Sequence, residues 1–404
     1  MGVSLPVANR SKRTEFAVLI GRVRKLKPLF REAARDTENN RRVSKRAMDL
    51  LDDAEIMRML RPAAFGGFEY GTSEAARIAF EIGQACGSTA WCASLAMSYQ
   101  WMGSFFPLEA QRELWSDPDR CMIAAVFNPS RAVELAPGGV KLAGEWLYAS
   151  NCDNADWLIL GALVPNASGA PEAMWALVPA TMAVIKQSTW FTSGLQGSGS
   201  KTVVIKTPVF VPDHRLLRFS DILAGTVPGK AIEGNVMAHI RFMPFGPTGL
   251  VAPILGMAQG ALEAFTQTCQ TRVRAIKPGM IVPVANSPII QSKIGAASAA
   301  IESACSLLFD SVAAAEEKVR RGGQLSIEER IAIRRNQGFA AKQSVLVVND
   351  LFAKEGAAGS DSTAPLQRFW RDVNAAALHV SLDWEAIAAM YGQQRLGLEP
   401  VGLY

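Results

Sequence analysis

The sequence predicts an α+β protein in which a region of β-strands lies between two helical regions. Changes in the spacing of apolar side chains indicate this order. Residues from about 13 to 116 and those after about 238 repeat apolar side chains every three or four positions, whereas residues 121–211 form short apolar runs separated by Gly, Pro and Asn. We therefore expect an N-terminal helical domain over residues 1–117, a central β domain over 118–235 and a C-terminal helical bundle over 236–404.

The first helical region contains two segments with a helical spacing of Ala, Leu, Met and aromatic side chains, Ala75–Cys86 and Ala90–Phe106. Pro107 stands where a further helix would begin, since proline is tolerated in the first turn of a helix.

The central region contains five apolar runs of strand length: Met122–Phe127, Val140–Ala149, Trp157–Val164, Met174–Val178 and Val203–Val211. Their spacing favours an antiparallel β unit. Residues 157–185 hold only one charged side chain, but a turn cluster at 165–171 interrupts them, which fits two buried strands better than a membrane span. Residues 212–238 are expected to form an irregular connection.

The last region begins with a long helix, Ile289–Arg320, in which Ile294, Ile301 and Leu308 recur every seven residues beside small alanines. Such a stripe is typical of helices that approach closely, either in a bundle core or at a subunit interface. Glycines at 322 and 323 end this helix, and the run Ser326–Glu329 has the spacing of a capping box for the next one.

The composition argues against several other classes of protein. With 404 residues and 49% hydrophobic side chains, the chain can bury a core without disulfides or metals. The net charge of +5 is spread along the chain, so no nucleic-acid partner is expected. Six scattered cysteines and three histidines predict no metal site. The N-terminal residues lack the apolar core of a signal peptide, and we expect a soluble cytoplasmic protein with no membrane partner.

Four motifs in order along the chain resemble those of a known family. They are Gly87-Ser88-Thr89-Ala90-Trp91, the stretch Gly144–Trp157, the turn Gly194–Ser200 followed by Val209–Pro212, and the tail Phe369–Asp372. From about residue 15 to residue 398, the chain resembles the flavin-dependent monooxygenase branch of the acyl-CoA dehydrogenase superfamily. The resemblance implies an N-terminal helical domain, a central antiparallel β-barrel or sandwich and a C-terminal four-helix bundle.

The residues after the tail motif favour a monooxygenase over a dehydrogenase. In many acyl-CoA dehydrogenases, a Glu at the position of Val380 removes a proton from the thioester substrate. Val380 has no titratable group, and His379 lies one residue earlier, on what is expected to be the last helix of the bundle. By resemblance, His379 is expected to donate a hydrogen bond or relay a proton to the peroxide or the substrate, with a structural role as the alternative.

The resemblance also assigns flavin contacts to the second motif. It implies that Trp146 lies over the isoalloxazine and that the Ser150 hydroxyl binds near N5. Core packing of Trp146 and an ordinary strand-end role for Ser150 are the alternatives. Asn151 and Asn154 replace the usual Gly and His of this motif, which leaves any role of that His open.

Other flavin contacts are expected at the glycine-rich turn and in the C-terminal helices. The turn would bring Gly197, Ser198 and Ser200 near the flavin, although a plain turn between strands is the alternative. The remaining expected contacts are Arg272, Gln291 and Arg371. In the family, residues at the positions of Arg272 and Gln291 often reach the flavin from a neighbouring subunit; the alternative is that both are solvated helix residues.

Two residues are predicted to contact the substrate in addition to His379. Tyr99 falls where phenol hydroxylases of this branch commonly carry a His; a Tyr can donate or accept a hydrogen bond but is not a base near neutral pH. Packing within the helices is its alternative role. Asn128, expected on the loop after the first β-strand, would hydrogen-bond the substrate.

The sequence thus predicts the oxygenase component of a two-component flavin monooxygenase. Reduced FAD or FMN would form a C4a-hydroperoxide with O2 and oxygenate a small aromatic or heteroaromatic compound, indole-like or phenol-like, with a neutral heteroaromatic favoured because the phenol-binding His is missing. No dinucleotide-binding fingerprint is present in the sequence, so a separate NAD(P)H-dependent flavin reductase is expected. A homotetramer is also expected. The alternatives are a dehydrogenase acting on a thioester and a non-catalytic scaffold of the same fold.

Overall fold

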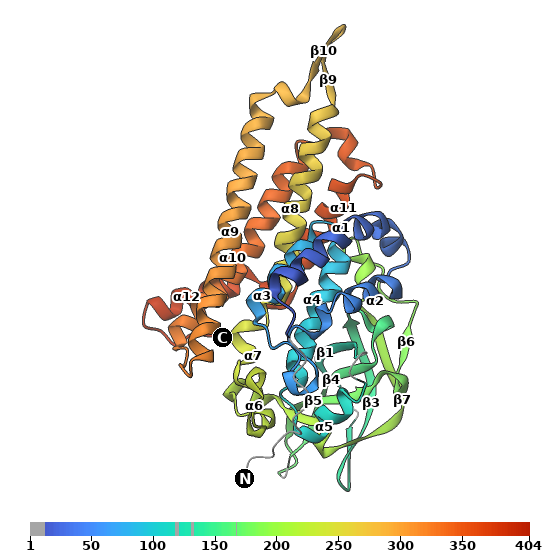
Figure 1. The fold of residues 1–404 in the computed structure, drawn as a ribbon, viewed down its shortest axis with the longest axis vertical. Coiled ribbons are helices and arrows are strands. Elements are labelled where there is room, and N and C mark those ends of the chain that lie inside the picture. Colours follow the sequence, from blue (N-terminus) through green and yellow to red (C-terminus); the bar gives the residue numbers. More distant parts are fainter. Residues whose placement is uncertain (1–12, 118–120, 131–132, 167) are drawn as a thin grey trace.

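The structure is a computed structural model that describes residues 13–117, 121–130, 133–166 and 168–404. Figure 1 shows a tall body of helices with a β region packed beside its lower half. A small β-hairpin extends from the upper end of the helices, far from the β region (Figure 1).

The N-terminal helices are α1 (Phe16–Asn39), α2 (Lys45–Asp53), α3 (Thr72–Gly83), α4 (Gly87–Gly103) and α5 (Leu108–Leu114). The two predicted helices correspond to α3 and α4, and α5 begins directly after Pro107 as predicted. Almost every side chain of α4 is buried, because this helix lies between α3, the bundle and the β region. It is therefore the element that can carry side chains from the helical body into the β region.

The β region consists of two four-stranded sheets. One has the order β1 (Ile123–Ser130), β4 (Trp157–Pro165), β5 (Pro171–Pro179), β8 (Leu216–Arg218); the other has the order β2 (Val133–Ala136), β3 (Gly139–Ala149), β7 (Lys201–Pro212), β6 (Val184–Lys186). The five predicted strands are present. The strands β2, β6 and β8 were not predicted, because three or four residues are too few to show an alternating pattern.

The prediction of a wholly antiparallel β unit is wrong for one pair, since β1 and β4 run parallel. Between them the chain crosses to the other sheet, where it forms β2 and β3, and then returns in its original direction. Such a crossover produces a parallel pair. Apolar side chains of both sheets form a separate buried cluster between them.

The C-terminal half forms a bundle of α8 (Thr248–Thr271), α9 (Pro288–Arg320), α10 (Ile327–Phe352) and α11 (Pro365–Ala376), with α12 (Trp384–Arg395) packed on α10. Two short helices, α6 (Phe219–Ala224) and α7 (Phe242–Phe245), precede it. The hairpin of β9 (Val273–Lys277) and β10 (Met280–Pro283) joins α8 to α9 and was not predicted.

The predicted features of α9 and α10 are present. The side chains of Ala297, Ile301, Ala304 and Leu308 are buried, and α9 packs on α8 and α10, so much of the stripe belongs to the bundle core. The capping box before α10 is formed: the Ser326 hydroxyl accepts a hydrogen bond from the Glu329 amide at 3.1 Å, and the Glu329 carboxylate accepts one from the Ser326 amide at 2.7 Å.

The two helical regions share one hydrophobic core, because α3 and α4 pack directly against α8. Glu316 on α9 strengthens this contact by accepting hydrogen bonds at the start of α3 from the Thr72 amide (2.6 Å), the Thr72 hydroxyl (2.7 Å) and the Ser73 amide (3.2 Å). The predicted domain boundaries at 117 and 235 stay a prediction, since a shared core does not mark them.

By length and composition alone, α9 is the one helix among the described residues that could cross a membrane. Of its most apolar window, 33% is buried within the fold. The core helix of a soluble protein meets the same criterion, so the observation is weak evidence for a membrane span.

Candidate functional site

Three of the predicted site serines meet in one hydrogen-bonded group, which we call the serine cluster: Ser150, Ser198, Ser200 and the indole of Trp91. The Ser150 hydroxyl lies 2.7 Å from that of Ser200, and Ser200 lies 2.7 Å from Ser198. Trp91 Nε1 donates a hydrogen bond to Ser150 Oγ at 3.1 Å. The residues come from α4, the end of β3 and the turn before β7, so the fold joins segments that are far apart in sequence.

The serine cluster can leave one hydroxyl proton free. If Ser198 donates to Ser200 and Ser200 to Ser150, then Ser150 accepts from both Ser200 and Trp91, and its own hydrogen is available to another acceptor. Ser150 is the most exposed serine of the cluster, at 7%, compared with 5% for Ser200 and 1% for Ser198. The arrangement therefore suits a hydroxyl that donates to a ligand atom.

His379 lies beside the serine cluster, with its ring centroid 6.1 Å from that of Trp91. The prediction that it lies on the last helix is wrong: it follows α11 and caps a single 3-10 turn, Val380–Leu382, which precedes α12. The Ser381 amide donates to His379 Nδ1 at 3.2 Å. Because Nδ1 accepts, the neutral ring carries its proton on Nε2.

The surroundings of His379 favour the neutral form. Desolvation by the surrounding protein, and secondarily the positive charge of Arg334, lower the pKa of His379 below its ordinary value, and because the residue is exposed, solvent limits this effect. A neutral imidazole with a proton on Nε2 can donate a hydrogen bond near pH 7. This chemistry agrees with the predicted donor role, which stays a prediction.

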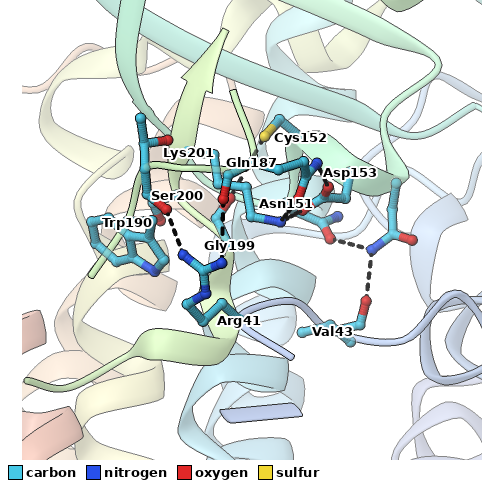
Figure 2. Close-up of polar contacts among 12 residues, drawn as sticks. Arg41, Val43, Asn151, Cys152, Asp153, Gln187, Trp190, Gly199, Ser200 and Lys201 are labelled. Atoms are coloured by element: carbon cyan, nitrogen blue, oxygen red, sulfur yellow. Dashed lines mark hydrogen bonds and ion pairs between the residues drawn. The ribbon is translucent and has the colours of Figure 1, made fainter. Parts of the chain in front are cut away.

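A buried ion pair holds the two segments that carry the serines. Lys201, the residue after Ser200, is 1% exposed, and its Nζ lies 2.6 Å from Asp153 Oδ2 and 2.7 Å from Gln187 Oε1. The Gln187 amide donates to Asp153 Oδ1 at 2.7 Å. Figure 2 shows these three side chains pointing toward one another, with Arg41 donating to the backbone on one side. The contacts tie the turn after Ser150 to the start of β7.

The two departures from the family motif have structural roles in this chain. Asn151 adopts a left-handed conformation with a φ of 62°, which asparagine tolerates better than most residues other than glycine. The Asn154 side-chain amide donates to the Val43 carbonyl at 3.1 Å and to Asn151 Oδ1 at 2.9 Å. Asn154 therefore anchors the turn to the segment between α1 and α2.

The glycine-rich turn is packed against helices. A side chain at Gly197 would collide with Thr37 of α1 and with Ser88 of α4. The close approach of the two helices gives this glycine a structural reason, and its predicted contact with the flavin stays a prediction.

The tail motif fixes the same turn from the other side. Asp372 accepts a hydrogen bond from the Leu195 amide at 2.7 Å, and its complete burial raises its pKa to about 6. Arg371, a predicted flavin contact, pairs with Glu38 and donates to the Ser193 carbonyl at 3.0 Å. Within this chain, Arg371 therefore binds α1 and the turn.

The prediction that Trp146 lies over the isoalloxazine is wrong. Its side chain is 1% exposed and lies in the cluster between the two sheets, where Nε1 donates to the Gly161 carbonyl at 2.8 Å. Both faces of the ring are covered by protein, so the core-packing alternative is correct.

Tyr99 lies two turns beyond Trp91 on α4, and residues eight apart share one face of a helix. Its ring is 6.3 Å from that of Phe127 on β1, which stacks on Trp175 at 4.5 Å. Phe242 meets both of these rings, at 6.2 Å and 5.5 Å. We call Tyr99, Phe127, Trp175 and Phe242 the aromatic cluster.

The aromatic cluster was not predicted, because an aromatic residue on a strand has the same pattern whether it lines a site or a core. Burial raises the pKa of Tyr99 well above its ordinary range, so its hydroxyl keeps its proton. Asn128 follows Phe127, and its side chain is exposed; it lies within β1 and not on the loop after it as predicted.

Two predicted flavin contacts lie at the opposite end of the bundle, beside the β9–β10 hairpin. Arg272 donates to the Glu355 carbonyl at 2.7 Å and lies 3.4 Å from the Glu355 carboxylate. Gln291 donates to the Ala285 carbonyl at 2.9 Å and is exposed. The structure does not bring either residue to the serine cluster of the same chain.

The serine cluster fits a flavin in its hydrogen-bonding chemistry. A reduced flavin carries a carbonyl oxygen at C4 beside N5, and the hydroxyl proton that the serine cluster can leave free on Ser150 would be donated to such an acceptor. Among the residues that the structure describes, no three His, Cys, Asp or Glu side chains are grouped so that they could hold a metal ion. The prediction that the protein uses no metal is not tested by this observation.

Comparison with known proteins agrees with the sequence motifs. A family model described as the acyl-CoA dehydrogenase C-terminal domain matches residues 248–384. The chain is 36% identical over 395 residues, 96% of each protein, to the oxygenase component of the FADH(2)-dependent resorcinol hydroxylase of Rhizobium sp. strain MTP-10005.

Two solved structures share the whole fold. The HsaA monooxygenase of Mycobacterium tuberculosis superposes with a TM-score of 0.88 at 30% identity, covering 96% of this chain and 99% of that one. XiaF from Streptomyces sp., in complex with FADH2 and glycerol, superposes with a TM-score of 0.84 at 26% identity, covering 96% and 97%.

This chain belongs to the flavin-dependent monooxygenases that are built on the acyl-CoA dehydrogenase fold. It is the oxygenase component of such an enzyme, and its cofactor is a reduced flavin. The predicted family, fold and enzyme class are confirmed, and neither a thioester dehydrogenase nor a non-catalytic scaffold describes the chain.

Proposed function

We propose that this protein uses reduced FAD and O2 to hydroxylate a small phenolic compound. One oxygen atom enters the aromatic ring, the other leaves as water, and the flavin supplies the two electrons. The observation that carries the proposal is the meeting of the serine cluster with His379, in a chain 36% identical to a resorcinol hydroxylase.

Each site residue has a defined task in this proposal. The Ser150 hydroxyl would donate to the C4 carbonyl beside N5 of the bound flavin, because N5 of a reduced flavin itself carries a hydrogen, and Ser198 and Ser200 orient that hydroxyl. Neutral His379 donates through Nε2 to the oxygen that is being transferred or to the substrate. Trp91 lies between the two groups and restricts the access of water.

A phenolic substrate suits the face of α4 that carries Tyr99. The protonated Tyr99 hydroxyl forms no hydrogen bond within the described part of the chain and can donate to or accept from a substrate hydroxyl. The rings of Phe127 and Trp175 offer an apolar wall beside it. Asn128 is available to a second polar group of the substrate.

The remaining features of the proposal concern partners. A separate NAD(P)H-dependent flavin reductase would supply the reduced flavin, as expected of an oxygenase component. A homotetramer would place Arg272 and Gln291 of one subunit at the flavin of another, and the protein would act in the cytoplasm.

The test uses the purified chain without a reductase. Chemically reduced FAD, 18O-labelled O2 and resorcinol are mixed with the protein, and the product is analysed by mass spectrometry. The proposal predicts one 18O atom in each molecule of hydroxylated product. The proposal would be overturned if all of the oxygen consumed were released as hydrogen peroxide and no hydroxylated product formed, both with resorcinol and with monohydroxylated phenols. Labelled product from indole alone would move the substrate class to neutral heteroaromatics.

A further inference from the structure

A second candidate binding site lies apart from the serine cluster. A cavity of about 430 Å³ opens between the segment after β8 and the loop that joins α9 to α10. Figure 1 shows α6 and α7 beside the lower ends of α9 and α10, at the opposite end from the hairpin. The lining residues are Ala224, Gly225, Lys230, His239, Arg241, Phe245, Val319 and Gly322–Leu325.

The polar lining of this cavity is basic. Lys230, His239 and Arg241 face it, and none of its lining residues in the described part of the chain is acidic. Arg241 bonds the backbone carbonyl of Ala224, which leaves its charge without a carboxylate partner among the described residues. Lys230 likewise forms no ion pair within the described ranges.

The basic groups act on one another. Burial lowers the pKa of Lys230, and the charge of Arg241 lowers it further. Burial and then the charge of Lys230 lower the pKa of His239. Burial and then the charge of Arg241 lower the pKa of Arg330 on α10, whereas Tyr404 raises it. Arg330 Nη1 donates to the Tyr404 backbone oxygen at 3.3 Å, and its buried Nε has no hydrogen-bond partner in the described structure. Lys230 and Arg241 thus bring positive charges together with no carboxylate among the described lining residues, which is unfavourable, and a bound anion would relieve it.

The cavity is next to the aromatic cluster. Phe242, whose ring meets Phe127 and Trp175, directly follows Arg241, and Phe245 of the same short helix lines the cavity. Arg241 in the cavity is therefore the direct neighbour in sequence of Phe242, a member of the aromatic cluster.

We propose that this cavity binds the carboxylate or phosphate group of a small anionic ligand. The cavity has room for more than a single ion, its polar groups are cations, and guanidinium and ammonium groups are the usual partners of both oxyanions. The proposal concerns binding alone and does not depend on the hydroxylation proposed above.

The test is calorimetric titration of the full chain at pH 7 and low ionic strength, with inorganic phosphate and separately with benzoate. Wild type should bind at least one of them saturably. Lys230→Met should weaken that binding about tenfold, because a charge-assisted hydrogen bond is lost, and His239→Gln should weaken it less. Lys25→Met, which removes an exposed lysine of α1, is the matched control and should bind like wild type.

The two probes distinguish the source of the oxyanion. Binding of phosphate without competition from benzoate would indicate a phosphate-bearing ligand, and displacement of phosphate by benzoate would indicate an aromatic acid. Absence of saturable binding by both anions would overturn the proposal. Equal affinities in wild type, Lys230→Met and His239→Gln, with melting temperatures showing that the variants are folded, would overturn it as well.

Discussion

The serine cluster and the hairpin end of the bundle were both predicted to contact flavin, yet they are built in opposite ways. The serine cluster joins α4, β3 and the turn before β7, and its polar atoms bond one another and can leave one hydroxyl proton free. At the hairpin end, Arg272 and Gln291 bond carbonyls of their own chain. One chain thus completes the first region, whereas in the proposed homotetramer the second region would reach the flavin of another subunit.

The largest predicted effect belongs to the first region. His379→Asn should slow oxygen transfer by about 10²–10⁴, because a positioned proton donor contributes a factor of that size. Single-turnover product formation with chemically reduced FAD measures it, and affinity for the reduced flavin should be retained. His214→Asn, which changes a histidine that bonds Glu113 on the surface, is the control. Wild-type rates in His379→Asn from pH 6 to 9 would show that His379 only packs against Trp91.

A second prediction concerns the contact that joins α9 to α3. Glu316→Gln should lower the free energy of unfolding by about 1–3 kcal/mol, because glutamine loses the acceptor for one buried amide. Denaturant unfolding measures the change. Glu317→Gln alters an exposed neighbour that pairs with Arg321 and should stay within about 0.5 kcal/mol of wild type. Equal stability of the two variants would contradict the proposed capping of α3.

The third prediction concerns Asp372, which holds the turn beneath the serine cluster. Because burial raises its pKa to about 6, the folded protein takes up a proton near pH 6 that the unfolded chain takes up only at lower pH. The ionised group therefore opposes folding above pH 6, and this penalty is relieved as the pH falls.

Asp372→Asn retains an oxygen for the Leu195 amide but carries no charge. The free energy of unfolding of the variant minus that of wild type should increase by about 1–2 kcal/mol as the pH rises from 4 to 7. Urea unfolding at several pH values measures this difference. Parallel pH profiles for the two proteins would mean that Asp372 does not titrate in this range.

The smallest effect is expected at the hairpin end. Arg272→Gln should weaken the binding of reduced FAD about fivefold, since in the proposed homotetramer it would remove a contact from a neighbouring subunit and change no group near the reacting atoms. The yield of hydroxylated product per bound flavin should stay the same. A fall in that yield at saturating flavin would show that the hairpin end affects the reaction itself and not only the binding of the flavin.

The comparison also shows what the sequence could predict. The helices and the capping box at Ser326 were predictable from spacing, and the family resemblance assigned both Ser150 and Ser200 to the flavin, which is consistent with their meeting in the structure. The parallel pairing of β1 with β4 was not, since a strand's direction depends on the path of the chain between sheets.

Individual side chains were harder to predict than elements. Trp146 and Trp91 both belong to family motifs, but only the fold shows that the first is enclosed between sheets and the second bonds Ser150. The buried pair of Lys201 and Asp153 was missed because charged residues in a strand and a turn have the same pattern whether they are solvated or paired.

The central claim is that Ser150 positions the reduced flavin in this chain. The most direct measurement is the ratio of hydroxylated product to oxygen consumed in Ser150→Ala, with Ser311→Ala on α9 as the control. Loss of one hydrogen bond of about 1–3 kcal/mol should raise the share of oxygen released as hydrogen peroxide by roughly tenfold, while Ser311→Ala behaves like wild type. An unchanged ratio in a folded Ser150→Ala protein would contradict the claim and place the flavin elsewhere.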